Sequence, residues 1–168
     1  MPAPFNITEI SVILADYRNP VHARDLVFLM NEYAQDTMGG GEALSQHCQR
    51  HLVERLQNFP TAYTWLAYHY AKPVGLLNAF MGFSTFKCQP LLNIHDVIVQ
   101  QQARGLGISR LLFEAAESHA KTLGCCKMTL EVLAGNEPAK RAYRTFGYDN
   151  YRLDESTGMA EFWQKCLD

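Results

Sequence analysis

Residues 97–112 hold a predicted strand, a glycine turn and the start of a long helix, and they read Val97-Ile98-Val99-Gln100-Gln101-Gln102-Ala103-Arg104-Gly105-Leu106-Gly107-Ile108-Ser109-Arg110-Leu111-Leu112. The β-branched run at the start is typical of a strand. From Ile108 the apolar residues fall at helical spacing as far as Leu123, and Gly124 is a natural stop. Such a turn exposes unpaired N–H groups and the positive end of the helix dipole, so we expect it to bind an anion.

This turn matches neither of two common nucleotide-binding motifs. Gly105 and Gly107 allow a phosphate to approach the backbone closely, and Arg104 can add a charged contact. A dinucleotide-binding fingerprint needs a third glycine where Arg110 stands. The other glycine run, Gly39-Gly40-Gly41, lacks the lysine that a nucleoside-triphosphate loop requires. The sequence therefore argues against both kinds of nucleotide site.

The pattern outside this stretch predicts further strands and helices in a mixed order. Alternating or β-branched runs predict strands at residues 10–14, 61–70, 74–83, 91–99, 127–133, 148–153 and 160–167. Apolar residues at helical spacing predict helices at residues 20–38, 44–56, 108–123 and 139–146. Residues 154–158 should form the turn between the last two strands. This order predicts an α/β (mixed α+β) fold, in which helices cover the faces of a mixed sheet.

Composition and charge predict one compact cytoplasmic domain. The 168 residues are 48% hydrophobic, which is enough for a full core, so a single domain over residues 1–168 is expected. A net charge of -2 without runs of like charge argues against nucleic-acid binding. No apolar run approaches the ~18 residues of a membrane span, and the first residues lack the positive charge of a leader. The odd set of five cysteines favours reduced thiols.

A second motif follows the next predicted strand, and it reads Asn136-Glu137-Pro138-Ala139-Lys140-Arg141-Ala142-Tyr143-Arg144-Thr145-Phe146-Gly147-Tyr148. Together with residues 97–99 and 104–108, it resembles the GNAT superfamily of acetyl-CoA-dependent N-acetyltransferases, and most closely its diamine-acetyltransferase-like members. The resemblance covers residues 91–153, and it departs from the family at Ser109, where Gly or Ala is usual. It implies a mostly antiparallel sheet of six to seven strands with about four flanking helices, and an acyltransferase activity.

The resemblance also implies a binding site for acetyl-CoA, which acts as a cosubstrate without a metal. The turn residues would hold the pyrophosphate, and these are Arg104, Gly105, Leu106, Gly107, Ile108, Ser109 and Arg110. The pantetheine arm would bond to the backbone of Val97 and Val99 as an extra strand, and Asn136 would contact its amides. Tyr143 would give a proton to the departing thiolate, and a phenol with a pKa near ~10 suits that role.

Direct attack on the thioester requires a neutral amine, so a base must remove its proton. His95 falls where several family members carry a glutamate base, and a neutral imidazole serves at physiological pH. Glu131 on the neighbouring strand is the second candidate, and water is the third. We expect Asp96 to point to the opposite face of its strand from His95 and to be structural.

Several alternatives stay open at this point. Cys125 or Cys126 would carry the acyl group in a covalent mechanism. His47 and His51 have a spacing that metal sites use, although a solvated helix face is the favoured interpretation. A CoA-binding regulatory or interaction module without turnover is the alternative from another functional class.

The acceptor of the acetyl group cannot be identified from the sequence. A small amine or a peptide amine would fit, and residues 36–42 and 80–86 are expected to line its cleft. The family resemblance also makes a homodimer through residues 160–167 a hypothesis.

Overall fold

The computed structural model describes residues 7–167. Residues up to Leu130 form one unit, and residues from Glu131 onward form a second. The described part of the first unit starts with a short 3-10 helix, Ile7–Glu9, and contains the strands β1 (Ile10–Leu14), β2 (Ala62–His69), β3 (Lys72–Ser84), β4 (Gln89–Val99) and β5 (Met128–Leu130). Its helices are α1 (Pro20–Gln35), α2 (Gln46–Gln57) and α3 (Ile108–Thr122), with a second 3-10 helix, Gln101–Ala103, after β4.

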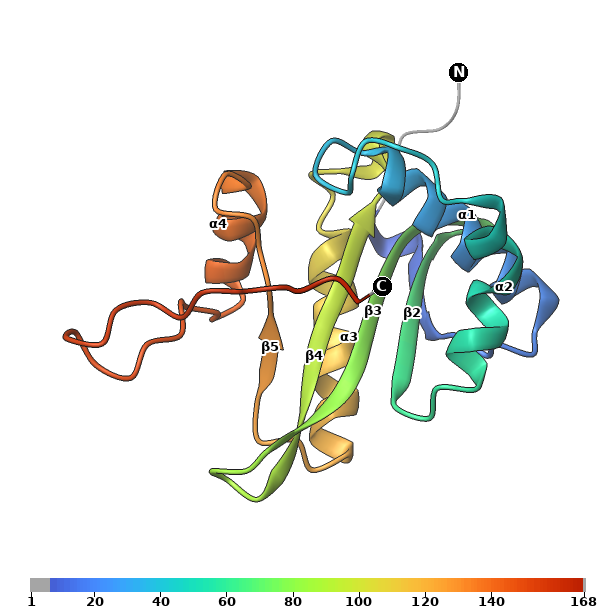
Figure 1. Cartoon of the computed structure of the whole chain (residues 1–168). Coiled ribbons are helices and arrows are strands. Elements are labelled where there is room, and N and C mark those ends of the chain that lie inside the picture. The colour runs from blue at the N-terminus through green and yellow to red at the C-terminus, as the bar shows by residue number, and fades with distance from the viewer. Residues whose placement is uncertain (1–6, 168) are drawn as a thin grey trace. The chain divides into compact units, whose positions relative to one another are not determined.

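The five strands of the first unit form one sheet in the order β1-β2-β3-β4-β5, and Figure 1 shows β2 to β5 side by side in this order. The pairs from β1 to β4 are antiparallel, whereas β5 lies parallel to β4. A parallel neighbour needs a crossover connection, and α3 supplies it. The chain therefore runs from the end of β4 through the glycine turn into α3 before it returns to the sheet.

The helices of the first unit begin at the polar residues that the sequence pattern indicates. The side chain of Asn19 accepts a hydrogen bond from the N–H of Val21 at 2.9 Å, and Pro20 occupies the first turn of α1. The Ser45 hydroxyl accepts from the N–H of Cys48 at 3.1 Å and caps α2. These side chains satisfy backbone donors that a helix leaves open at its N-terminal end.

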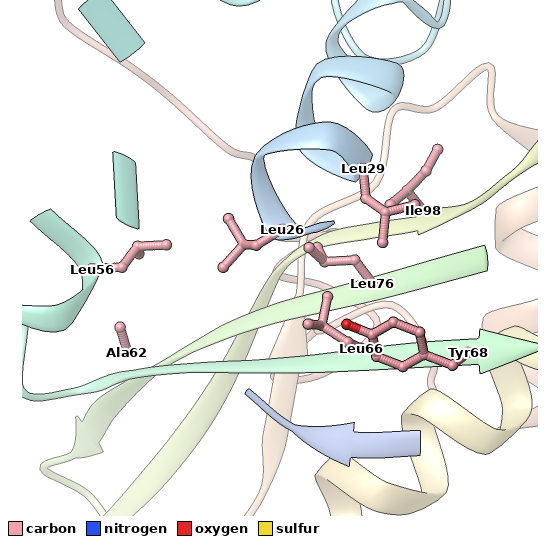
Figure 2. Packing of buried hydrophobic residues seen from close by; sticks show 8 residues of the cluster. All are labelled: Leu26, Leu29, Leu56, Ala62, Leu66, Tyr68, Leu76 and Ile98. Carbon is pink, nitrogen blue, oxygen red and sulfur yellow. The ribbon is translucent and has the colours of Figure 1, made fainter. Parts of the chain in front are cut away.

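Both faces of the sheet are covered by helices. On one face, Leu26 and Leu29 of α1 pack in a buried cluster with Leu66 of β2 (Figure 2). On the other face, the rings of Tyr63 and Trp65 lie 4.9 Å and 5.7 Å from the ring of His119 in α3. Because alternate residues of a strand point to opposite faces, β2 contributes to both layers.

A glycine in β3 sets how closely α3 approaches the sheet. A Cβ atom at Gly75 would lie 3.1 Å from a methyl group of Ile108 and 3.2 Å from one of Leu112. Both side chains belong to the first turns of α3 and are buried. The absence of a side chain at Gly75 therefore lets the start of α3 pack directly against the sheet, and this contact positions the glycine turn.

The second unit contains α4 (Glu137–Thr145) and irregular segments. The side chain of Asn136 accepts from the N–H of Ala139 at 3.2 Å and caps this helix, and Pro138 lies in its first turn. The helix ends at Thr145, and Gly147, with a φ of 87°, follows directly after its C-terminal cap Phe146. This stop agrees with the sequence prediction.

The predicted fold class is confirmed, with a mixed, mostly antiparallel sheet and four helices among the described residues. The expected six to seven strands are wrong for residues 7–167, which contain five. Residues 148–153 and 160–167 form no strands. The N–H of Ala160 donates to the oxygen of Tyr151 at 2.9 Å, but this bond is not extended into a strand pair. Residues 149–167 are also exposed, so no buried face favours an extended pairing there.

Within residues 7–167, no helix combines the length and the hydrophobicity that a membrane crossing requires.

Candidate active site

A β-bulge at His95 interrupts β4. Asn78 of β3 pairs with Asp96, and the next residue, Ala79, pairs with Ile94, so β4 carries one extra residue at this point. The pairing of β4 with β5 ends at Ile94, directly before the bulge. In the described part of the first unit, no strand pairs with β4 beyond Ile94 on the β5 side. The far end of β4 therefore has an open edge.

The backbone of Val97 and Val99 faces this open edge. The N–H of Gln100 donates to the oxygen of Val74 at 3.0 Å, so the N–H of Gln100 faces β3. The N–H and C=O groups of one strand residue point to the same side and those of the next residue point to the opposite side, so Val99 and Val97 direct their N–H and C=O groups away from β3. Before the bulge the even-numbered residues face the β5 side instead, since the N–H of Leu92 donates to the backbone oxygen of Lys127, next to β5. The extra residue at His95 brings Val97 and Val99, which the family resemblance selected, to face the edge.

The glycine turn follows this edge and ends at the N-terminus of α3. Gly105 and Gly107 have φ angles of 82° and 79°, which only glycine adopts readily. The first hydrogen bond of the helix joins the N–H of Leu111 to the oxygen of Gly107 at 3.2 Å. The N–H groups of the three residues from Ile108 to Arg110 precede that bond, and Gly107 has no side chain to cap them. A Cβ atom on Gly105 would meet nothing within 4 Å. The turn thus combines free donors with open space, as an anion site requires.

Arg104 connects this turn to the end of α1. Its guanidinium donates to Asp36 Oδ2 at 2.7 Å and to the oxygen of Val99 at 3.1 Å. Asp36 is the C-terminal cap of α1. The hydrogen bond from Arg104 holds the pKa of the Asp36 carboxyl below its usual range, and the N–H of Met38 acts in the same direction. Arg104 therefore fixes the exit of β4 in addition to any contact with a phosphate.

The other turn side chains differ in their environment. Leu106 and Ser109 are partly buried, whereas Ile108 is buried in the core, so Ile108 can offer only its backbone to a ligand. Arg110 is exposed and donates to Glu114 at 2.7 Å, one helical turn further along α3. The hydrogen bond with Glu114 raises the pKa of the Arg110 guanidinium above its ordinary value.

His95 and Asp96 lie on the same face of the sheet, which corrects the expectation that they point in opposite directions. The ring of His95 lies 5.4 Å from that of Phe80, and Asp96 accepts from Asn78 at 3.0 Å. Phe80 and Asn78 are two residues apart on β3 and share a face. Simple alternation fails here because the bulge turns two consecutive residues of β4 to one side.

A line of polar side chains reaches Asp96 through the middle of the sheet, and sequence reasoning missed it. Thr64 donates to Asn78 Oδ1 at 2.6 Å, and Asn78 donates to Asp96 Oδ2. Tyr17 contacts the Thr64 hydroxyl at 3.0 Å. The available signal was Asn78 itself, the amide side chain in the otherwise apolar run from Val74 to Phe83.

The remaining predicted site residues belong to the second unit. Asn136 and Tyr143 lie at the start and near the end of α4, seven residues apart, and this spacing places them on one helical face. The partly buried ring of Tyr143 lies 6.3 Å from that of Tyr148. Glu131 is exposed and comes directly after β5. The roles of all three residues stay predictions.

The thiols and histidines of the described chain form no metal cluster. Among residues 7–167, no group of three or more His, Cys, Asp or Glu side chains is placed to hold a metal ion. Burial raises the pKa of the Cys125 thiol, and Cys126 raises it further. A raised pKa reduces the thiolate fraction, so Cys125 is poorly suited to act as a nucleophile.

Known proteins resemble the chain in sequence and in fold. A family model described as "Acetyltransferase (GNAT) family" matches residues 26–148. The streptothricin acetyltransferase of Streptomyces lavendulae is 35% identical over 82 residues, which make up 49% of this chain and 43% of that protein. The match therefore spans less than half the length of this curated relative.

Two solved structures share the fold. An aminoglycoside acetyltransferase from an uncultured soil metagenomic sample, in complex with sisomicin, has a TM-score of 0.75 and 16% identity, over 95% of this chain and 98% of that chain. AAC(6')-Iy, in complex with a bisubstrate analog, has a TM-score of 0.73 and 14% identity, over 94% and 99% of the two chains. Because the family match runs over most of the sequence and includes both β4 and the glycine turn, the chain belongs to the GNAT family of acetyltransferases.

Proposed function

We propose that residues 1–168 act as one N-acetyltransferase domain, which moves the acetyl group of acetyl-CoA to an amino group within a ternary complex. The observation that carries this proposal is the open edge of β4 at Val97 and Val99, next to the uncapped start of α3. An extended chain that carries amides at one end and a diphosphate at the other matches this pair of features. Family membership supports acetyl-CoA as that molecule.

The cosubstrate would bind through backbone groups more than through charged side chains. The pantetheine amides would pair with Val97 and Val99 as a short extra strand. The pyrophosphate would accept hydrogen bonds from the N–H groups of residues 108–110 and would lie over Gly105. Arg104 would keep the strand and the turn in place through its bonds to Asp36 and Val99.

The reaction would proceed by direct attack of the amine on the thioester. The amine nitrogen forms a bond to the carbonyl carbon, the carbon–sulfur bond breaks, and the electron pair leaves with sulfur. Tyr143 would protonate that thiolate, and His95, Glu131 or a water molecule would take the proton that the amine loses. No group of the protein forms a covalent bond to the acetyl group in this scheme.

The acceptor would be a small amine or a peptide amine. The names of the relatives refer to streptothricin and to aminoglycosides. Phe80 contacts the His95 ring, and its other ring neighbour is Phe59, at 5.6 Å. These partly exposed rings would form one wall of the acceptor site.

Thiol release tests the proposal directly. Purified protein with acetyl-CoA and a panel of amines should produce free CoA at a steady rate, together with acetylated amine detected by mass spectrometry. Calorimetry should show binding of CoA. Binding without turnover across the whole panel would favour the CoA-binding module, and absence of CoA binding would rule out both functions.

The replacement Tyr143→Phe tests the proton donor. Loss of a general acid should lower kcat by about 10–100-fold while the KM for acetyl-CoA stays within about 3-fold. Tyr148→Phe is the matched control, because it removes a phenol from the neighbouring ring of the same unit. A kcat within a factor of about two for Tyr143→Phe would show that Tyr143 does not act as the acid.

A further inference from the structure

The polar line Tyr17–Thr64–Asn78–Asp96 holds one carboxylate in a fixed orientation. Thr64 and Asn78 are direct partners across β2 and β3, and Asn78 and Asp96 are partners across β3 and β4. Thr64 is 1% exposed and Asn78 is 3% exposed. The Thr64 hydroxyl donates to the amide oxygen of Asn78, so the amide nitrogen of Asn78 must face Asp96 Oδ2.

Burying the polar side chains of Thr64 and Asn78 costs desolvation free energy, which apolar side chains at the same positions would not. Two apolar residues of similar shape at positions 64 and 78 would leave no buried polar group to satisfy. Buried polar side chains in the middle of a sheet fix the geometry of the groups they contact. The group at the end of this line is the partly exposed Asp96.

Asp96 lies next to the end of α1 and has no cationic partner there. Burial raises the pKa of Tyr33 in α1, and the charges of Asp96 and Asp36 raise it further, which places both carboxylates near this phenol. Arg104 pairs with Asp36. Within residues 7–167, Asp96 forms no ion pair, and its Oδ1 atom accepts no hydrogen bond. Asp96 also shares its face of the sheet with His95.

We propose that Asp96 determines acceptor specificity: its carboxylate binds a second positive charge on the acceptor, and Thr64 and Asn78 position it. The inference rests on the proposed acetyltransferase function. The reacting nitrogen must be neutral when it attacks, and a carboxylate in contact with it would stabilise its protonated form. A carboxylate held beside the bulge therefore suits another ammonium of the same molecule. The acceptor class is an amine with at least one further cationic group.

Two acceptors of equal chain length test this assignment, namely 1,4-diaminobutane and 4-amino-1-butanol. Both offer a primary amine, but only the diamine carries a second ammonium. The wild-type protein should acetylate the diamine with a kcat/KM at least about 10-fold higher, as expected for a charged pair in a partly buried site. Added salt should raise the KM for the diamine and leave that for the amino alcohol unchanged.

The replacement Asp96→Asn removes the charge and keeps the shape. It should raise the KM for the diamine by about 10-fold or more, while kcat and the kinetics with the amino alcohol stay within about 3-fold. Glu32→Gln is the matched control, because it removes the same charge from an exposed position of α1. Thr64→Val should weaken the preference for the diamine, and Thr64→Ser, which restores the hydroxyl, should recover it.

The outcomes separate this inference from the function on which it rests. If no amine is acetylated, the proposed function fails and the inference fails with it. If the wild-type protein is active but does not prefer the diamine, only the assignment of Asp96 is wrong. An equal loss of kcat for both acceptors in Asp96→Asn would also overturn it, because that result indicates a role in proton transfer. The wild-type preference and its salt dependence decide the question even if the Asp96 variant does not fold.

Discussion

At Gly105, an experiment can separate the effect of backbone strain on stability from the effect of a side chain on ligand binding. Its φ of 82° strains any other residue, but a Cβ atom there would meet nothing within 4 Å. Gly105→Ala should therefore cost about 1–2 kcal/mol of stability through backbone strain alone. The added methyl would also occupy the space that a phosphate needs, so we expect the Kd for CoA to rise by about 10-fold or more.

Gly124 provides the control for this experiment. It follows the C-terminal end of α3 and has a φ of 70°, and a Cβ atom added to it would likewise meet nothing within 4 Å. Gly124→Ala should reduce the Tm to a similar extent and leave CoA binding unchanged by calorimetry. Equal Kd values for CoA in both variants would show that the glycine turn is not part of the binding site.

The residues that could be predicted from the sequence are those whose role depends on the backbone. The glycine turn follows from its own residue types, whereas the family resemblance selected Val97 and Val99. The structure gives the turn an uncapped helix start and the end of β4 an open edge, and the binding roles of these residues stay predictions. The orientation of Asp96 could not be predicted, because a bulge has no clear sequence signature at His95. Simple alternation assigns the wrong face to every residue on one side of such an insertion.

At the scale of elements, one ion pair connects the end of α1 to the exit of β4. Arg104 and Asp36 are 51% and 25% exposed, so their pair should contribute only about 0.2–1 kcal/mol. Because the folded pKa of Asp36 is lowered, this stabilisation is present above the ordinary aspartate pKa of about 3.9 and is lost as the pH falls through the folded value. Asp36→Asn should therefore reduce the unfolding free energy at pH 7 and make little difference near about pH 2.

The same replacement should affect cosubstrate binding, because Arg104 also bonds to the oxygen of Val99. We expect the KM for acetyl-CoA to rise by about 3–10-fold as the turn loosens. Glu117→Gln is the control, since it breaks an exposed pair with Lys121 of 2.6 Å near the other end of α3. Denaturant unfolding at both pH values, with steady-state kinetics, measures the two effects. A pH-independent stability difference would contradict the electrostatic explanation.

The elements that the sequence predicted wrongly are those that depend on a distant partner. Helices α1 to α4 each carry local start or stop signals, and they lie near their expected positions. Residues 148–153 and 160–167 carry a strand-like pattern, but a strand also needs a neighbouring edge to bond with. The turn between them does form, with the Asp154 carboxylate accepting from the N–H groups of Ser156 and Thr157 at 2.8 Å and 2.9 Å. Local turn chemistry is therefore easier to predict than pairing.

At the scale of the whole molecule, residues 160–167 expose apolar side chains that a second copy of the chain would cover. Phe162, Trp163 and Leu167 are 74%, 82% and 88% exposed. Several large apolar side chains exposed within one short segment indicate an interaction surface. We therefore predict a homodimer through residues 160–167, and light scattering with size-exclusion chromatography should give twice the mass of the 19.1 kDa chain. The double replacement Phe162→Ser and Trp163→Ser should give the mass of one chain.

Phe86 provides the control for the dimer, because its side chain is 100% exposed in the turn between β3 and β4. Phe86→Ser removes a comparable apolar side chain from a different surface, so it should leave the mass unchanged. A monomeric wild-type protein at concentrations of about 100 μM, well above the Kd of a stable dimer, would contradict the prediction. If both the double variant and Phe86→Ser lose the dimer, the interface includes the β3–β4 turn as well. The residues expected to bind acetyl-CoA, in the range 97–110 and at Asn136, lie outside residues 160–167, so acetyl-CoA binding should stay unchanged in the double variant, and calorimetry with CoA tests that separation.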